Sequence, residues 1–367
     1  MAIAESAATD DDVIRFLIDG GILEAEEIVG SGVTLQEGVR RNRNTRVEFS
    51  DGSGVFVKRP EPMSPLSQDT LIAEGEFYLA HGTERSPLAG VLARLRHFDR
   101  SVPVIVLELL SHHRSLREIC LTSGVIDFPI SAYRSAARAL ADVHGLAPAS
   151  MSNRIASVVR PVEWIAGLRR PEPRILTSIS NAGLGVLEIV QASASIDRGI
   201  AGLEEMWRPE ALVHGDVRAD NLLVDLRPDG EPDVRIIDWE LWQVGDPAWD
   251  VAGLLEAAVT LVIGSPALAD TGPDVLTGTA NGISVIQVTC RGIWNSYATA
   301  RGLSPADRQD MTPRVVTYCA ARIIQSVAEL TARADAIPGA ALVLLQVAEN
   351  IFAEPERATA EFFALPR

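Results

Sequence analysis

The sequence predicts an α+β protein in two lobes, a small β-rich N-terminal lobe and a larger helical C-terminal lobe. Residues 45–58 form a hairpin pattern, in which Asp51-Gly52-Ser53-Gly54 separates two alternating runs. Helical periodicity dominates after residue 110. The polar motifs lie in a short strand–loop–strand region, residues 211–238, and directly behind it. We therefore expect a division into residues 1–107 and 108–367, with a cleft between the lobes.

The N-terminal lobe is predicted to contain strands around one helix. The helix follows the hairpin at Gln68–His81, where apolar residues share one face and Gly82 marks the end. Two strand-like runs come next, Gly90–Phe98 and Val102–Leu109. The second run is nearly all apolar, which is typical of a strand covered on both faces.

The C-terminal lobe is predicted to be mainly helical. Ser131–His144 has clear helical periodicity, and residues 147–210 suit two or three further helices. Residues 248–363 read as helical again, with breaks near 264–273 and 337–339. The apolar run Val251–Ala269 carries a Glu and is interrupted by Gly and Pro, so it indicates a buried helix and not a membrane span.

The overall composition limits the function. The chain has 367 residues, and its 33 basic and 49 acidic residues give a net charge of −16. Such acidity argues against binding to nucleic acid or an anionic membrane. It suits a cationic acceptor, but it would equally suit solubility or a saline habitat.

The cysteines and the N-terminus suggest a cytoplasmic protein. Cys120, Cys290 and Cys319 are far apart and show no metal-ligand spacing, as expected of core thiols in a reducing compartment. The first residues show no basic region followed by an apolar stretch, so we expect no signal peptide.

The segment His214–Asn221 has the residue types that phosphoryl transfer requires: a carboxylate near the acceptor hydroxyl and oxygen ligands for Mg²⁺. Asp216 is the candidate base. Asn221 can offer an amide oxygen to Mg²⁺. Asp238 directly follows the strand-like run 234–237 and is the main candidate metal ligand.

Three motifs in order resemble the aminoglycoside phosphotransferase-like branch of the protein-kinase-like fold. They are His214-Gly-Asp with Asn221, Ile237-Asp-Trp, and Gly245-Asp-Pro-Ala-Trp-Asp250. The resemblance implies that Asp216 positions or deprotonates the hydroxyl and that Asn221 and Asp238 hold Mg²⁺. His214 and Asp250 would be structural supports, with the Asp250 carboxylate accepting hydrogen bonds from the catalytic-loop backbone.

Upstream, Val55-Phe-Val-Lys58 resembles the strand whose lysine grips the α- and β-phosphates of ATP. Its partner should be a Glu on the next helix, and we favour Glu74 over Glu76 because Glu74 lies near the face of Phe77. No Gly-x-Gly-x-x-Gly precedes Lys58. The corresponding stretch, residues 36–44, could hold phosphate with Arg side chains or be a solvated basic hairpin.

Further residues carry expectations from the same resemblance. Glu108-Leu-Leu110 resembles the hinge whose backbone meets the purine edge, which leaves ATP and GTP undistinguished. His144 should pack as a structural residue under the catalytic loop. Arg218 could reach the γ-phosphate and offset negative charge, or be a surface arginine.

Trp239-Glu240 stands where protein kinases have Phe-Gly. The loss of that glycine removes an easy backbone pivot. We therefore expect a site that is always in its active arrangement.

The acceptor is the least determined feature. Segments 320–326 and 344–351 resemble Ser/Thr kinases of ribosomal peptide pathways, such as class V lanthipeptide or thioamitide clusters, in which a separate partner lyase then eliminates the phosphate from a precursor peptide. The competing reading is a hydroxyl of a small molecule: an aminoglycoside, a choline-like compound, a sugar or another antibiotic. A non-catalytic nucleotide-binding scaffold is the alternative outside enzymes. Its mark would be loss of Lys58, Asp216, Asn221 or Asp238, and all four are present.

Overall fold

The computed structural model describes residues 10–24, 33–39, 42–62, 64–123, 128–146, 160–173, 179–227, 230–265 and 275–366. Contacts divide the chain into two compact units. The N-terminal unit comprises Met1–His113 and Val234–Trp242, and the C-terminal unit comprises Arg114–Asp233 and Gln243–Arg367. The predicted division at residue 107 did not foresee that Val234–Trp242 packs with the N-terminal unit. Such packing is a tertiary contact between segments far apart in the sequence, which local patterns do not reveal.

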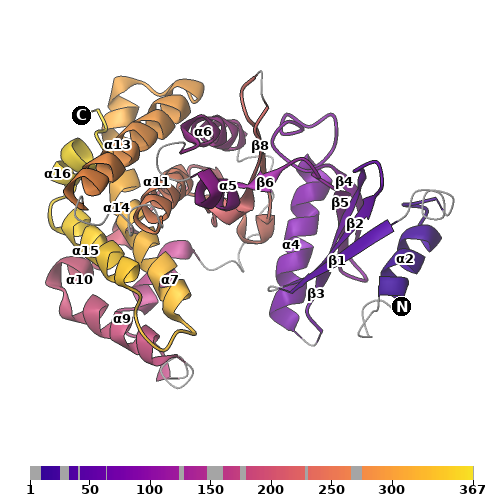
Figure 1. The fold of residues 1–367 in the computed structure, drawn as a ribbon, viewed down its shortest axis with the longest axis horizontal. Coiled ribbons are helices and arrows are strands. Elements are labelled where there is room, and N and C mark those ends of the chain that lie inside the picture. The colour runs from indigo at the N-terminus through magenta and orange to yellow at the C-terminus, as the bar shows by residue number, and fades with distance from the viewer. Residues whose placement is uncertain are drawn as a thin grey trace. The chain divides into compact units, whose positions relative to one another are not determined.

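The N-terminal unit is built on an antiparallel five-stranded sheet (Figure 1). Its strands, in spatial order, are β1 (Val33–Val39), β2 (Asn42–Phe49), β3 (Gly54–Pro60), β5 (Val104–Glu108) and β4 (Leu95–Asp99). The predicted hairpin is confirmed by the pairing of β2 with β3. The strand expected at Gly90–Phe98 begins only at Leu95, because residues 86–92 form hydrogen-bonded turns.

Two helices flank this sheet. α2 (Asp10–Asp19) packs Val13 and Leu17 on the sheet face that carries Val57. α4 (Pro65–His81) supplies the partner of Lys58, and Lys58 points to the opposite face because successive strand residues alternate. The prediction of one helix in this part was wrong, since the unit contains both α2 and α4. The amphipathic pattern of α2 lies ahead of the first strand and was overlooked. The predicted helix at 68–81 is present, and Ser64 caps its start.

The C-terminal unit is mainly helical (Figure 1). Its helices are α5 (Leu116–Ser123), α6 (Ile130–His144), α7 (Pro161–Gly167), α9 (Asn181–Ala192), α10 (Ala194–Met206), α11 (Pro247–Ile263), α13 (Val275–Ala300), α14 (Pro305–Thr331), α15 (Gly339–Ala353) and α16 (Pro355–Arg357). α11 packs against α6, α13 and α14, and nearly all of its side chains are buried. The buried helix predicted from the apolar run Val251–Ala269 is thus confirmed as far as Ile263, and residues 266–269 lie outside the described residues. Within the described ranges, none of the helices combines the length and hydropathy needed to cross a membrane.

Short strands carry the motif region. β7 (Ala211–Val213) pairs with β10 (Gln243–Gly245), and β6 (Arg114–Ser115) pairs with β8 (Leu222–Asp225). The segment between β7 and β8 contains the motif His214–Asn221 and ends in the short helix η2 (Ala219–Asn221). β9 (Asp233–Ile236) leads to Asp238 and the short helix η3 (Trp239–Leu241). These pairings explain why polar motif residues follow strand ends.

Candidate active site

The segment predicted to be the catalytic loop, residues 214–221 and called the catalytic loop below, is shaped by bonds among its own residues. Gly215 has φ +82°, a conformation that favours glycine. The Asp216 amide donates to His214 Nδ1 at 3.1 Å. Asn221 Nδ2 donates to the Asp216 carbonyl oxygen at 3.0 Å. This last bond uses the amide nitrogen of Asn221 and fixes the orientation of the amide, so its oxygen is the atom that would meet a metal ion.

Asp250, on the first turns of α11, anchors the start of this loop. Its carboxylate accepts the backbone N–H of His214 at 2.6 Å and that of Gly215 at 3.0 Å. Burial alone would raise the pKa of Asp250, but the hydrogen bond and charge of His144 and the interactions of His214 hold it below its usual value. His144 Nε2 lies 3.1 Å from the Asp250 carboxylate, and its Nδ1 lies 2.9 Å from the Tyr297 hydroxyl. His144 is fully engaged in this buried network.

Two further side chains hold the carbonyl groups on either side of Asp216. Trp249 Nε1 donates to the Gly215 carbonyl oxygen at 3.0 Å. Arg322 Nη2, from the middle of α14, donates to the Val217 carbonyl oxygen. Together with Asp250, these residues leave the backbone around Asp216 little freedom.

Gly253 on α11 allows this close packing. A Cβ at this position would lie 2.4 Å from the Val217 carbonyl oxygen and 3.2 Å from Arg322 Nε. Sequence reasoning missed Trp249, Gly253 and Arg322. The signals were a glycine inside a helix, where glycine is unfavourable, and a single arginine in the apolar stretch Ala320–Ile324.

The Asp216 carboxylate has two arginine neighbours. Arg218 Nε donates to Asp216 Oδ1 at 3.1 Å, and Arg218 Nη2 lies 2.9 Å from Glu329 on α14. Arg322 Nη2 lies 3.7 Å from Asp216 Oδ1. Arg218 was expected either to reach a phosphate or to be a surface residue. The structure places its guanidinium between two carboxylates, and the side chain as a whole is 30% exposed.

In the N-terminal unit, Lys58, Glu74 and Asp238 form one cluster. Lys58 Nζ lies 2.6 and 2.8 Å from the Glu74 oxygens and 2.7 Å from Asp238 Oδ1. Burial lowers the pKa of Lys58, but the charges of Glu74 and Asp238 outweigh it and the net pKa is raised. Burial raises the pKa of Glu74, and Asp238 adds to this against the opposing effect of Lys58. The lysine thus stays charged among competing carboxylates.

Asp238 is held in an unusual backbone conformation by the residues after it. Its φ of 70° and ψ of 57° are left-handed. The Trp239 ring stacks on Phe77 at 4.1 Å between centroids, and its backbone N–H donates to Glu74 at 3.3 Å. Trp242 Nε1 donates to the Ala73 carbonyl oxygen at 2.8 Å. The segment that presents Asp238 is therefore fastened to α4.

Glu108, predicted to lie at the hinge, uses its side chain within the N-terminal unit. Its carboxylate accepts the Arg94 backbone N–H at 2.8 Å, and its own backbone N–H donates to the Arg94 carbonyl oxygen at 2.9 Å. The Leu110 carbonyl oxygen accepts the His113 N–H. The Glu108 carboxylate is thus engaged by Arg94, the residue before β4, whereas the predicted contact with the purine involves the backbone of this segment. In the phosphate-covering stretch, Arg40 and Arg41 lie outside the described residues.

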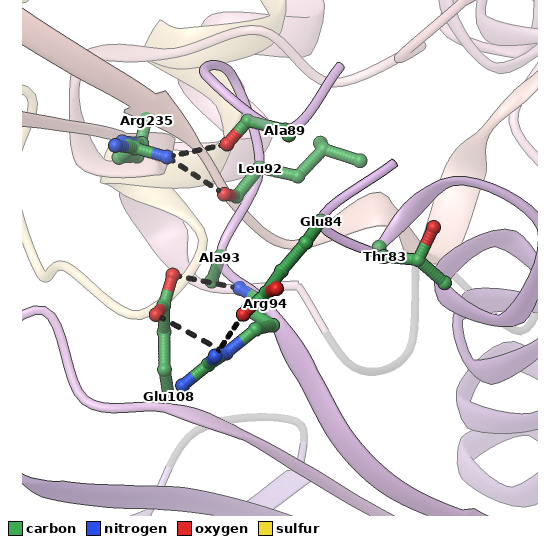
Figure 2. A pocket seen from close by; sticks show the side chains of 9 residues that line it. Thr83, Glu84, Ala89, Leu92, Ala93, Arg94, Glu108 and Arg235 are labelled. Atoms are coloured by element: carbon green, nitrogen blue, oxygen red, sulfur yellow. Dashed lines mark hydrogen bonds and ion pairs between the residues drawn. The ribbon is translucent and has the colours of Figure 1, made fainter. Parts of the chain in front are cut away.

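The Glu108 carboxylate borders a pocket of about 380 Å³ in the N-terminal unit. Figure 2 shows Arg94 directed at both Glu84 and Glu108 there. Arg235 turns its guanidinium to the carbonyl oxygens of Ala89 and Leu92, at 2.8 and 3.1 Å (Figure 2). The charged side chains of this pocket are thus engaged in ion pairs with one another or in hydrogen bonds to backbone carbonyl groups.

The donor atoms suit Mg²⁺ by their chemistry. Asp238 offers a carboxylate and Asn221 an amide oxygen, which are hard ligands. Across the described part of the chain, no group of three or more His, Cys, Asp or Glu side chains is arranged to hold a metal alone. Mg²⁺ commonly binds through one or two protein ligands together with substrate phosphates and water. Each of the two side chains, taken by itself, therefore offers a donor that suits a metal arriving with a nucleotide.

Comparison with known proteins agrees with these observations. The model of the phosphotransferase enzyme family matches residues 34–274. No curated protein is significantly similar in sequence. Among solved structures, an ethanolamine kinase of Plasmodium vivax is 10% identical with a TM-score of 0.55, covering 94% of this chain and 90% of that chain. A GDP complex of aminoglycoside 2'-phosphotransferase-IIIa is 15% identical with a TM-score of 0.53, covering 95% of this chain and all of that chain. The predicted bilobal kinase-like α+β fold is thereby confirmed.

Proposed function

Since this chain belongs to the phosphotransferase enzyme family, we propose that it transfers the γ-phosphoryl group of ATP, or of GTP, to the hydroxyl group of a small molecule with the help of Mg²⁺. The bond between the γ-phosphorus and the bridging oxygen breaks, and a new bond forms to the acceptor oxygen. The acceptor proton leaves through Asp216 or is released late, because a loose transition state requires little base assistance.

The observation that carries this proposal is the immobilised loop around Asp216. Asp250 holds the amide groups of His214 and Gly215, while Trp249 and Arg322 hold the carbonyl groups on both sides of Asp216. Phosphoryl transfer depends mainly on positioning and electrostatics. A carboxylate presented by a rigid loop can orient a hydroxyl at little entropic cost.

The cluster of Lys58, Glu74 and Asp238 in the N-terminal unit is proposed to bind the nucleotide, which is the phosphoryl donor. Lys58 is charged, held by Glu74, and suited to bind phosphate oxygens. Asp238 and Asn221 would hold Mg²⁺, which when bound neutralises phosphate charge. The backbone at Glu108–Leu110 is proposed to meet the purine. The side chains of that segment do not indicate whether ATP or GTP is bound.

For the acceptor, two observations favour a small molecule. The neighbours in fold are named as an ethanolamine kinase and an aminoglycoside phosphotransferase. The net charge of −16 also favours a cationic acceptor, because acidic surfaces concentrate cations. A Ser or Thr hydroxyl in a precursor peptide, processed by a partner lyase, is the alternative that a direct assay separates.

The assay incubates the chain with Mg²⁺ and ATP or GTP, together with aminoglycosides, macrolides, choline, ethanolamine or Ser/Thr-rich peptides. We expect a mass gain of one phosphoryl group on a small molecule. Phosphorylation of peptides alone would overturn the small-molecule assignment. Asp216→Asn should abolish transfer while nucleotide still binds, and an unchanged rate would refute the role of Asp216. Nucleotide binding without transfer to any acceptor would point to the scaffold alternative.

A further inference from the structure

Arg322 is the most completely buried cation near Asp216. It lies in the middle of α14 and is 2% exposed. Burying a guanidinium is costly unless it is paired and hydrogen-bonded. Its Nη2 donates to the Val217 carbonyl oxygen, whereas Nε and Nη1 have no hydrogen-bond partner among the residues that the structure describes. A buried side chain with unpaired donors calls for an explanation in the groups that surround it.

Several groups around Arg322 belong to the catalytic loop or hold it in place. The guanidinium carbon lies 5.2 Å from the centroid of the Trp249 ring, within cation–π range. Trp249 in turn holds the Gly215 carbonyl oxygen. Arg322 therefore reaches both carbonyl groups that flank Asp216, one directly and one through Trp249.

Charge gives a second link to Asp216. Arg322 Nη2 lies 3.7 Å from Asp216 Oδ1, on the carboxylate oxygen that also accepts from Arg218. The other carboxylate that interacts with Arg322 is Glu256 on α11, whose Oε1 accepts the Ser326 hydroxyl at 2.7 Å. Asp216 thus has two arginine neighbours, the partly buried Arg218 and the fully buried Arg322.

We propose that Arg322 is a positioning residue for phosphoryl transfer, which fixes the Asp216 carboxylate by holding the Val217 carbonyl oxygen and by its charge. This inference rests on the proposed role of Asp216. It predicts a loss in the rate of transfer without a loss in nucleotide affinity, because Lys58 and the backbone at Glu108–Leu110, which are proposed to bind the nucleotide, belong to the other unit.

The test compares the full-length variants Arg322→Met, Arg322→Lys, Arg308→Met and Asp216→Asn. Arg308 is the matched control, because it lies on the same helix and also donates to a backbone carbonyl, that of Leu303 at 3.2 Å. Turnover is measured with the small molecule that is phosphorylated in the panel, or as Mg²⁺-dependent ATP hydrolysis if none is. Nucleotide Kd is measured in parallel.

Arg322→Met should lower kcat by about 10²-fold, which is the scale for a small misplacement of a reacting group, with nucleotide Kd unchanged. Arg322→Lys should recover part of this loss, since it keeps the charge but lacks the planar fork. Arg308→Met should keep the wild-type kcat. If Arg322→Met does not fold, as judged by circular dichroism, the Lys variant decides: reduced kcat with unchanged Kd supports the inference.

Two results would overturn the inference in different ways. Wild-type kcat in a folded Arg322 variant, with Asp216→Asn inactive, removes the role of Arg322 and leaves the proposed function standing. Wild-type turnover in Asp216→Asn removes the role of Asp216 and, with it, that of Arg322.

Discussion

Asp250 Oδ2 accepts the backbone N–H of His214 at 2.6 Å, across 36 residues of sequence. A helix carboxylate therefore fixes the first residue of the catalytic loop. The same carboxylate also accepts the Gly215 N–H, so two buried donors depend on one side chain. This explains why the motif beginning at Gly245 ends in an aspartate.

Asp250→Asn should reduce both stability and activity. An amide offers one acceptor oxygen and turns an NH₂ group toward a backbone donor, so one buried N–H loses its partner. We expect the free energy of unfolding to fall by about 1–3 kcal/mol, measured by urea denaturation, and kcat to fall with it. Asp197→Asn, at an exposed ion pair with Arg169, is the control and should change neither.

The pH dependence of stability should report Asp250. Its pKa is lowered in the folded protein from 3.8, so folding releases protons at this group. The stability that it supplies is present above the unfolded value and is lost as pH falls through the lower folded value. The free energy of unfolding should therefore fall more steeply below pH 3.8 in the wild type than in Asp250→Asn. Equal slopes would contradict this origin.

Glu74→Gln and Glu76→Gln should differ sharply although the two residues are neighbours on α4. Glu74 holds Lys58, whereas Glu76 pairs with the exposed Arg100 at 3.0 Å. Exposed pairs contribute little. We expect kcat to fall by about 10²-fold in Glu74→Gln, because Lys58 is misplaced, and to stay unchanged in Glu76→Gln. Steady-state kinetics of both variants with the same nucleotide tests this prediction. Equal losses of kcat would refute the assignment of Glu74 as the partner of Lys58.

Gly253→Ala should disturb the catalytic loop by sterics alone. The added Cβ would meet the Val217 carbonyl oxygen at 2.4 Å. Overpacking of this kind costs about 1–3 kcal/mol, and we expect kcat to drop as Val217 moves. Gly202→Ala on α10 is the matched control, because a Cβ there has open space. It should raise stability by about 0.5–1 kcal/mol. Thermal unfolding measures the stability of both variants, and steady-state kinetics measures their kcat. A Gly253→Ala variant with unchanged stability and kcat would refute the close packing.

Asp238 should keep one orientation with and without nucleotide. Trp239 and Trp242 fasten its segment to α4, and Glu240 replaces a flexible glycine. Crystal structures of both states should show the same Asp238 conformer, and opposite orientations would refute a permanently active site. Asp238→Asn should fold normally, since Asn tolerates the left-handed region, but it should lose Mg²⁺-dependent transfer.

The sequence by itself determined the fold class and the residues of the motifs. Strand pairing at the hairpin and burial of α11 could be predicted because both follow from local patterns of turn residues and hydropathy. Asp250 could be predicted as the anchor of the loop, because the spacing of the three motifs resembles a known family.

Only the tertiary structure decided what surrounds Asp216. Arg322 lies 105 residues after Val217, and no local pattern relates the two. For Arg218 the sequence left open a contact with phosphate or a place on the surface, and the structure shows its contacts with Asp216 and with Glu329, which lies 111 residues away in the sequence. The return of Val234–Trp242 to α4 likewise depends on packing between distant segments. Local propensity specifies elements, whereas contacts between remote side chains arise only when those elements pack.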